Sequence, residues 1–161
     1  MGGIFTNGLF WALLGVALAV LVPGLGSSKG VGMVGEAASA VISDEPEKFG
    51  QLLLLQALPA TNGIYGFLTA FVILTQIGFL GGDVVYVPLL SGMLMFLATL
   101  PIIIVGYFSA IKQARIAVAA VGIVVKRPEE VAKGMIVVAM CETYAVLALL
   151  TTVLLVFNIA I

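Results

Sequence analysis

The chain has 161 residues, of which 62% are hydrophobic and 9% are charged, and its formal net charge is −1. No soluble domain of this size has such a composition, so we predict an integral membrane protein in contact with lipid and exclude a soluble enzyme. The small net charge gives no reason to expect a nucleic acid as partner. The chain has no histidine, the commonest metal ligand and catalytic base, and its one cysteine, Cys141, cannot form an internal disulfide.

Four apolar stretches follow one another along the chain, and each exceeds the roughly 20 residues that cross a bilayer. They run from about residue 5 to 42, 49 to 80, 87 to 125 and 131 to 161. Short polar segments separate them at 43–48, 81–86 and 126–130. The expected fold is therefore an all-α membrane protein whose four transmembrane helices form two antiparallel hairpins.

The basic residues indicate how the chain is oriented in the membrane. All seven lie near the first or the third polar segment, and none lies near the second segment or either terminus. By the positive-inside rule, loops 43–48 and 126–130 are cytoplasmic. Both termini and segment 81–86 are then outside, and the membrane is the cell membrane if the protein is bacterial.

The two hairpins repeat one another at an offset of 82 residues. We therefore divide the chain into a first hairpin, residues 1–80, and a second hairpin, residues 81–161. The matched pairs include Gly24 and Gly106, Ser27 and Ser109, Ala38 and Ala120, Pro46 and Pro128, and Thr61 and Thr143.

Glu142 is the only charged residue between Gly134 and Ile161, and the repeat places it opposite Ala60. A carboxylate at such depth costs roughly 2.5–3.5 kcal/mol on insertion scales, and such residues usually carry ions, relay protons or neutralise a bound group. The structural alternative is a carboxyl group that is paired with a neighbouring helix or kept protonated. We therefore take Glu142 as the candidate functional residue of the second hairpin.

Several polar groups are expected at the depth of Glu142, because helices rise equally per residue from the cytoplasmic loops. Pro59 should also free a backbone carbonyl at this level. The predicted set is Leu58, Thr61, Asn62 and Tyr65 on one face of the second helix, and Gln113 on the third. Hard cations prefer such all-oxygen shells. The alternative is that these side chains only bridge helices, at about 0.6 kcal/mol each.

The first helix carries many small residues around the segment GLGSSKGVGMVGEAASA. This surface predicts close packing against another helix, as on the crowded inside of a ring. It is not a phosphate-binding loop, because it lacks both the GK[ST] order and a preceding strand. Glu36 and Arg115 lie at similar heights and could pair, although extension toward the cytoplasmic headgroups is the preferred interpretation.

The chain resembles the rotor-ring proteolipids of V-type ATPases, and its pattern is most similar to that of the bacterial sodium-translocating members. The resemblance covers nearly the whole chain and includes GxGSSKGVGMVGEAA, PEKFGQ, LPATNGIYG, FSAIKQA and AMCETYA. It implies that Glu142 binds the transported ion. It also implies a sodium shell formed by the Leu58 carbonyl, Thr61, Tyr65 and Gln113. Sodium-binding members have Gln where this chain has the shorter Asn62, so Asn62 coordinates directly, acts through a water, or contributes no ligand.

The resemblance also implies how the chain assembles. Many copies would form a closed homo-oligomeric ring, because one pair of hairpins cannot bury its own apolar faces. The first and third helices would face inward, and the second and fourth outward. The implied partners are a membrane stator subunit with an arginine and the central-stalk and peripheral subunits of the ATPase. The chain itself would be non-catalytic and would have no nucleotide site.

We predict that the transported ion is sodium and not a proton, because a proton needs only the carboxyl group and one partner. One alternative is a stand-alone antiporter of the small multidrug type, which would need stacked aromatic side chains, such as Tyr65 and Tyr144, beside Glu142. Another is a passive pore or structural proteolipid, in which Glu142→Gln would preserve function.

Overall fold

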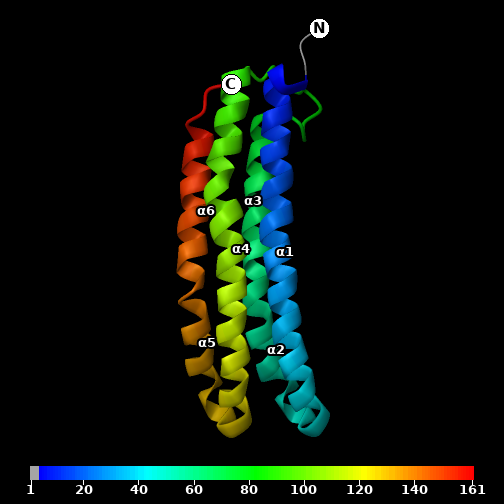
Figure 1. Ribbon diagram of the computed structural model, residues 1–161, viewed down its shortest axis with the longest axis vertical. Helices are drawn as coiled ribbons and strands as arrows, with labels where there is room; N and C mark the ends of the chain where they lie inside the picture. The colour runs from blue at the N-terminus through cyan, green and yellow to red at the C-terminus, as the bar shows by residue number, and fades with distance from the viewer. Residues whose placement is uncertain (1–3) are drawn as a thin grey trace.

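The computed structural model describes residues 4–161, which form four long helical rods lying side by side (Figure 1). Two rods are unbroken helices: α1 (Gly8–Asp44) and α4 (Leu89–Lys126). The other two are interrupted. The second rod consists of α2 (Phe49–Ala57), a 3₁₀ turn (Leu58–Ala60) and α3 (Thr61–Gln76). The fourth consists of α5 (Val131–Ala139) and α6 (Glu142–Phe157).

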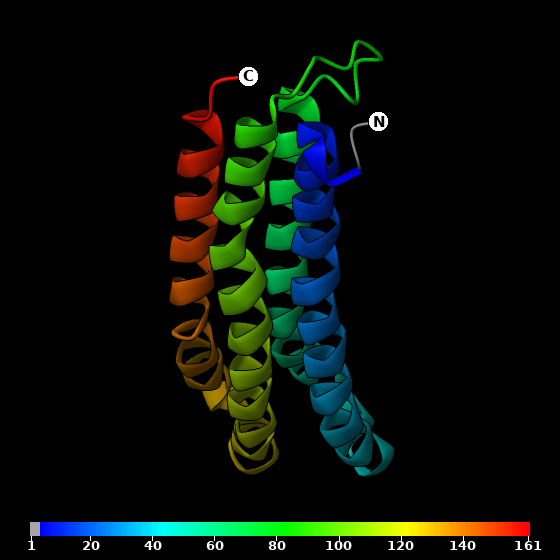
Figure 2. The ribbon, with the colours of Figure 1, turned by 45° about the horizontal axis from the view of Figure 1, so that its top comes forward.

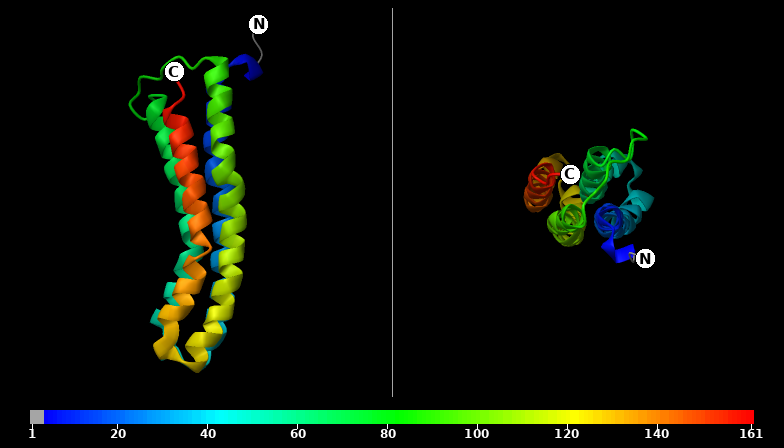
Figure 3. Two further views of the ribbon diagram at one scale, coloured as in Figure 1. Left: turned by 90° about the vertical axis from the view of Figure 1, so that its left-hand side faces the viewer. Right: turned by 90° about the horizontal axis from the view of Figure 1, so that it is seen from above.

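The rods form two layers, which are clearest in the two views of Figure 3. The unbroken helices α1 and α4 make one layer, and the interrupted rods α2–α3 and α5–α6 make the other. The C-terminus lies at the same end as the start of α1, together with the connection between α3 and α4, which extends beyond the helix ends (Figure 2). The predicted arrangement of two antiparallel hairpins is confirmed.

The lengths of the helices agree with a membrane protein. Within residues 4–161, three segments are long and apolar enough to cross a membrane, namely Gly8–Asp44, Pro46–Gln76 and Leu89–Lys126. The bent pair Pro128–Ala139 and Glu142–Phe157 makes a fourth crossing if it acts as one span. The chain is therefore an integral membrane protein, and the bent pair counted as one span gives the four crossings that the sequence predicts.

The helix ends are set by local chemistry. Asn7 begins α1 by accepting a hydrogen bond from the backbone N–H of Leu9 at 2.9 Å. The second rod ends at Gln76, earlier than the predicted residue 80, because Gly78 adopts a positive φ of 73° that stops the helix. Gly82 has a φ of 86° in the same connection, so the outer turn depends on glycine at both positions.

The two interruptions have different origins. Pro59 explains the first, since a proline removes a backbone donor and clashes with the preceding turn. The second lies at Met140 and Cys141, where the chain bends by 40° with neither proline nor glycine present. The sequence predicted the fourth spanning segment but not the bend within it.

Small residues allow α1 and α4 to pack closely. A Cβ atom on Gly26 would lie 2.9 Å from the Cα of Tyr107, so this side of α1 has no room for a side chain. The predicted role of the glycine-rich surface in close helix packing is therefore confirmed for this position. Many large apolar side chains remain exposed on the outside of the single chain, as expected where lipid or further protein covers them.

Candidate functional site

Glu142 is the first residue of α6 and follows directly on the break in the fourth rod. The hydroxyl of Tyr65, on α3, donates a hydrogen bond to its carboxylate oxygen Oε1. This bond offsets part of the loss of water around a carboxylate inside a membrane span, and the N-terminus of α6 adds a favourable partial positive charge. The carboxylate therefore lies at the junction of the two hairpins, which contribute one partner each.

Thr61 connects Tyr65 to the break in the second rod. Its hydroxyl donates to the Leu58 carbonyl at 2.8 Å, and its side chain also interacts with the Tyr65 hydroxyl. Leu58 begins the 3₁₀ turn that Pro59 imposes, which leaves its carbonyl oxygen beside the Thr61 side chain. The structure thus brings four of the predicted residues into one connected group of oxygen atoms, which ends at Glu142.

Asn62 and Gln113 form a separate pair in the core. The Nδ2 of Asn62 donates to the Oε1 of Gln113 at 3.0 Å, and both residues are fully buried. The Oδ1 of Asn62 and the Nε2 of Gln113 have no hydrogen-bond partner in the described part of the chain. Turning over both amide groups keeps the bond and frees the Gln113 oxygen instead. The pair thus holds one buried amide oxygen without a partner, and no hydrogen bond among residues 4–161 joins it to Glu142.

Two serine hydroxyls on the unbroken helices reach the breaks in the other layer. Ser109 of α4 donates to the carbonyl of Cys141, the N-cap residue of α6, at 2.9 Å. Ser27 of α1 donates to the carbonyl of Ala60, the N-cap residue of α3, at 3.4 Å. The repeat matches these two serines, but the sequence did not predict their contacts beside the site.

Gly30 allows α1 to approach the break in the second rod. A Cβ atom at this position would lie 2.9 Å from the Cβ of Pro59 and 3.1 Å from the carbonyl oxygen of Ala110. Gly24 and Gly32, by contrast, have no atom within 4 Å of such a Cβ. The glycine-rich surface therefore has one side that packs within the chain and one side that remains open.

The charged residues nearer loops 43–48 and 126–130 are not connected to Glu142 within the described residues. Glu36 and Arg115 are both exposed, and they do not pair with each other in the described residues. The ion pairs that the described residues do form, Glu45 with Lys48 and Glu130 with Lys133, lie at or beside these loops. The possible pairing of Glu36 with Arg115 is thus not formed within one chain.

The surroundings of Glu142 lack the aromatic stack that a multidrug-type antiporter needs. In the part of the chain that the structure describes, neither Tyr65 nor Tyr144 contacts another aromatic ring. Tyr144 is 68% exposed, and Tyr65 is engaged with the carboxylate. The stacked aromatic side chains that the antiporter alternative requires are therefore not found beside Glu142 in the described residues.

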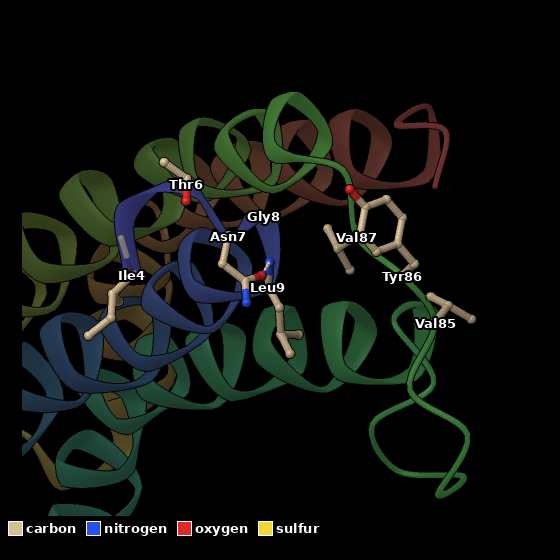
Figure 4. A pocket seen from close by; sticks show the side chains of 8 residues that line it. All are labelled: Ile4, Thr6, Asn7, Gly8, Leu9, Val85, Tyr86 and Val87. Atoms are coloured by element: carbon tan, nitrogen blue, oxygen red, sulfur yellow. Dashed lines mark hydrogen bonds between the residues drawn. The ribbon is translucent and has the colours of Figure 1, made fainter. Parts of the chain in front are cut away.

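Two hollows in the surface lie outside this group of oxygen atoms. An open one of about 550 Å³ is found at the outer end of the bundle, between the start of α1 and the residues that precede α4 (Figure 4). The second, of about 390 Å³, lies beside the break in the fourth rod and is lined by residues that include Ser109, Cys141 and Tyr144. Only the second hollow adjoins the candidate site.

Comparison with known proteins places the chain in a family. The model of the ATP synthase C-subunit family matches residues 14–73 and again residues 96–155. The two matches begin 82 residues apart, which is the offset of the repeat found in the sequence. The duplication of the hairpin is therefore confirmed independently of the motif comparison.

Two relatives match almost the whole chain. The V-type sodium ATPase subunit K of Enterococcus hirae is 47% identical over 152 residues, which are 94% of either chain. The A-type ATP synthase subunit K of Methanocaldococcus jannaschii is 35% identical over 151 residues, which are 94% of this chain and 64% of that protein. These matches confirm the resemblance to the proteolipids of rotary ATPases. With its hairpin duplicated and both copies matched, the chain belongs to the ATP synthase C-subunit family.

Proposed function

We propose that the chain is the ion-carrying rotor-ring subunit of a rotary V-type ATPase, and that it carries sodium across the membrane on Glu142. The observation that carries this proposal is the hydrogen bond between Tyr65 and Glu142, at the junction of two hairpins whose helices can span a membrane. The identity of 47% with a relative named as a sodium ATPase subunit supports it.

In this proposal Glu142 alternates between an ion-bound and an ion-free state. A sodium ion that enters from a stator half-channel neutralises the carboxylate, so that the site can cross the lipid as the ring turns. An arginine of the stator then competes for the carboxylate, and the ion leaves toward the other side. The hydroxyl of Tyr65 stabilises the carboxylate in its ionised form through a charge-assisted hydrogen bond.

The oxygen atoms near Glu142 favour sodium over a proton. Thr61 and the Leu58 carbonyl are connected to Tyr65, and the pair of Asn62 and Gln113 offers an additional buried amide oxygen. A proton would need none of these groups, whereas a hard cation uses several neutral oxygen ligands. In this assignment Glu142, Leu58, Thr61 and Gln113 coordinate the ion, Tyr65 holds the carboxylate, and Asn62 orients Gln113 or acts through a water molecule.

The assembly follows from the same proposal. Copies form a closed ring with α1 and α4 inside and the interrupted rods outside, and each copy consists of hairpins 1–80 and 81–161. Loops 43–48 and 126–130 face the cytoplasm and the central stalk, and both termini lie outside. The chain is the non-catalytic component, so ATP hydrolysis and torque come from the partner subunits.

The proposal is tested by labelling the assembled ring with a hydrophobic carbodiimide, which reacts with protonated carboxyl groups in apolar surroundings. Glu142 is expected to be labelled selectively, and sodium is expected to slow the reaction at fixed pH and ionic strength. Glu142→Gln should abolish labelling and sodium transport by the complex while the ring still assembles. A labelling rate that ignores sodium but falls as pH rises would identify the proton as the ion, and sodium transport by Glu142→Gln would contradict the role of Glu142 altogether.

A further inference from the structure

The two breaks in the outer layer are tied to the unbroken inner helices in the same way. In each hairpin, a serine of the inner helix donates to the backbone carbonyl of the residue that caps the next outer helix, which is Ala60 for α3 and Cys141 for α6. Ser27 and Ser109 are also matched by the repeat. The two donors therefore occupy related positions, whereas the two acceptors differ by one residue, because the repeat matches Ala60 with Glu142. Only one of the two breaks contains a proline.

The bond of Ser109 bears directly on the carboxylate. Cys141 immediately precedes Glu142, and α4 is a continuous helix of 38 residues that provides a rigid support. The 40° bend at this point contains neither proline nor glycine. The position of the Glu142 carboxylate relative to Tyr65 therefore depends on a contact between helices.

Ser27 makes the corresponding contact with the break in the second rod. Besides its bond to the Ala60 carbonyl, its Oγ accepts the backbone N–H of Gly63 at 2.7 Å. The Ala60 carbonyl and the Gly63 N–H lie on either side of Thr61 along the chain, and the Thr61 side chain interacts with the Tyr65 hydroxyl. Each of the two partners in the Tyr65–Glu142 bond is thus held against an inner helix by a repeat-related serine.

We propose that Ser109 is a positioning residue of the ion site: its hydroxyl fixes the bend before Glu142 and so sets the carboxylate where Tyr65 and the ion meet it. This inference rests on the proposed function, since it concerns the same carboxylate. Ser109 is assigned a positioning role, because its hydroxyl bonds to the Cys141 backbone and no hydrogen bond among residues 4–161 joins it to Glu142.

The experiment compares variants of Ser109 in assembled rings, with the sodium concentration that halves the carbodiimide labelling rate of Glu142 as the readout. Ser109→Ala should raise this concentration by about three- to tenfold, as expected for one lost hydrogen bond. Ser109→Thr keeps a hydroxyl, and the hollow of about 390 Å³ beside it can accept the added methyl group, so it should behave as wild type. Ser109→Val has the shape of Thr without the hydroxyl and should resemble the alanine variant.

Ser91→Ala is the matched control. Ser91 also lies on α4 and donates to a backbone carbonyl of another segment, that of Ala160 at 2.8 Å, but at the outer end of the bundle. Its loss should leave sodium protection unchanged. Because Thr and Val are nearly isosteric, comparing Ser109→Thr with Ser109→Val shows whether the hydroxyl affects sodium protection, even if the alanine variant does not assemble.

The failure of this inference can be told apart from the failure of the proposed function. If sodium does not protect the wild-type ring, sodium carriage is wrong, and the variants are then compared by the pH at which labelling falls by half. A shift in Ser109→Val that is absent in Ser109→Thr supports the positioning role under either ion. Equal values for wild type, Ser109→Val and Ser109→Thr would overturn it.

Discussion

At the scale of single residues, one side chain supplies the charge of the candidate site, and its neighbours supply hydrogen bonds. Glu142 supplies the one negative charge, and Tyr65 supplies the hydrogen bond that stabilises it. Thr61 links this bond to the Leu58 carbonyl, where the second rod is interrupted. Leu58, Thr61 and Tyr65 lie on the first hairpin, whereas Glu142 lies on the second. The bond between Tyr65 and Glu142 therefore forms only when the two hairpins meet.

Removing the Tyr65 hydroxyl should weaken sodium binding strongly. A hydrogen bond to a charged group contributes about 1.5–3 kcal/mol, so Tyr65→Phe is expected to raise the sodium concentration for half-protection of Glu142 by at least about tenfold. Tyr144→Phe is the control, because that tyrosine is 68% exposed and its hydroxyl has no hydrogen-bond partner in the described chain. If Tyr65→Phe needs the same sodium concentration for half-protection as the wild type, the hydrogen bond from Tyr65 does not contribute to sodium binding.

Variants of Asn62 and Gln113 can distinguish whether this pair supplies an ion ligand or only bridges two helices. Asn62→Leu alone leaves the buried Gln113 amide unpaired and should destabilise the ring by about 1–3 kcal/mol, whereas Asn62→Leu with Gln113→Met removes both partners and should be nearly neutral. The double variant should still need at least about tenfold more sodium for protection, because it loses an amide oxygen. Thermal denaturation and labelling are measured on the same preparation. Unchanged sodium protection in a stable double variant would assign the pair to packing alone.

At the scale of elements, the sequence predicts features that arise from local residue chemistry, but not those that depend on how helices contact one another. Apolar length, the repeat and the chemistry of Pro59 are local properties, and they correctly predicted four spanning segments, two hairpins and the break before Thr61. The break at Cys141 was not predicted, because neither proline nor glycine marks it in the sequence. The bond between Asn62 and Gln113 agrees with the alternative that these side chains bridge helices, although the sequence did not identify the two as partners. Counting from the loops gives the depth of a residue, but not the rotation of its helix.

The close approach of α1 to the second rod should depend on Gly30. Gly30→Ala would place a Cβ atom 2.9 Å from the Cβ of Pro59, so α1 must shift, and a loss of about 1–3 kcal/mol in ring stability is expected. Gly50→Ala is the control, since Gly50 is exposed on α2 with no atom within 4 Å of an added Cβ. That change should stabilise the helix by about 0.5–1 kcal/mol. Equal melting temperatures for the two variants would contradict this account of the packing.

At the scale of the whole molecule, the repeat predicts how one copy meets the next. The operation that carries the first hairpin onto the second, applied once more, generates the first hairpin of a neighbouring copy. The contact between Gly26 and Tyr107 then becomes a contact between Phe108 and the neighbour's Leu25. In the single chain these two side chains are 58% and 62% exposed, as expected for surfaces that assembly covers.

Cysteines at these two positions should therefore crosslink neighbouring copies. In a background with Cys141→Ser, the double variant Leu25→Cys with Phe108→Cys is expected to give a ladder of oligomers on oxidation, ending at the copy number of the closed ring. Either single variant should give no ladder beyond a dimer. A double variant that oxidises only within one chain, or not at all, would mean that copies do not meet in this register.

The absence of a carboxylate at Ala60 has a consequence for energy conversion in such a ring. At the offset of the repeat, Tyr65 matches Leu147 and Glu142 matches Ala60. Where two copies meet, the positions of the Tyr65–Glu142 bond are therefore occupied by Leu147 and the next copy's Ala60, neither of which is charged. Four spanning helices then share one ion-binding carboxylate. A ring of given circumference then moves half as many ions per revolution as one with a carboxylate in every hairpin. Each ion transported against 100 mV requires about 2.3 kcal/mol. Because the ATP hydrolysed per revolution is fixed by the soluble motor, halving the load lets each ion be driven against about twice the electrochemical gradient. In the proposed ring, one carboxylate for every four helices would thus favour a steep gradient over a large flux of ions.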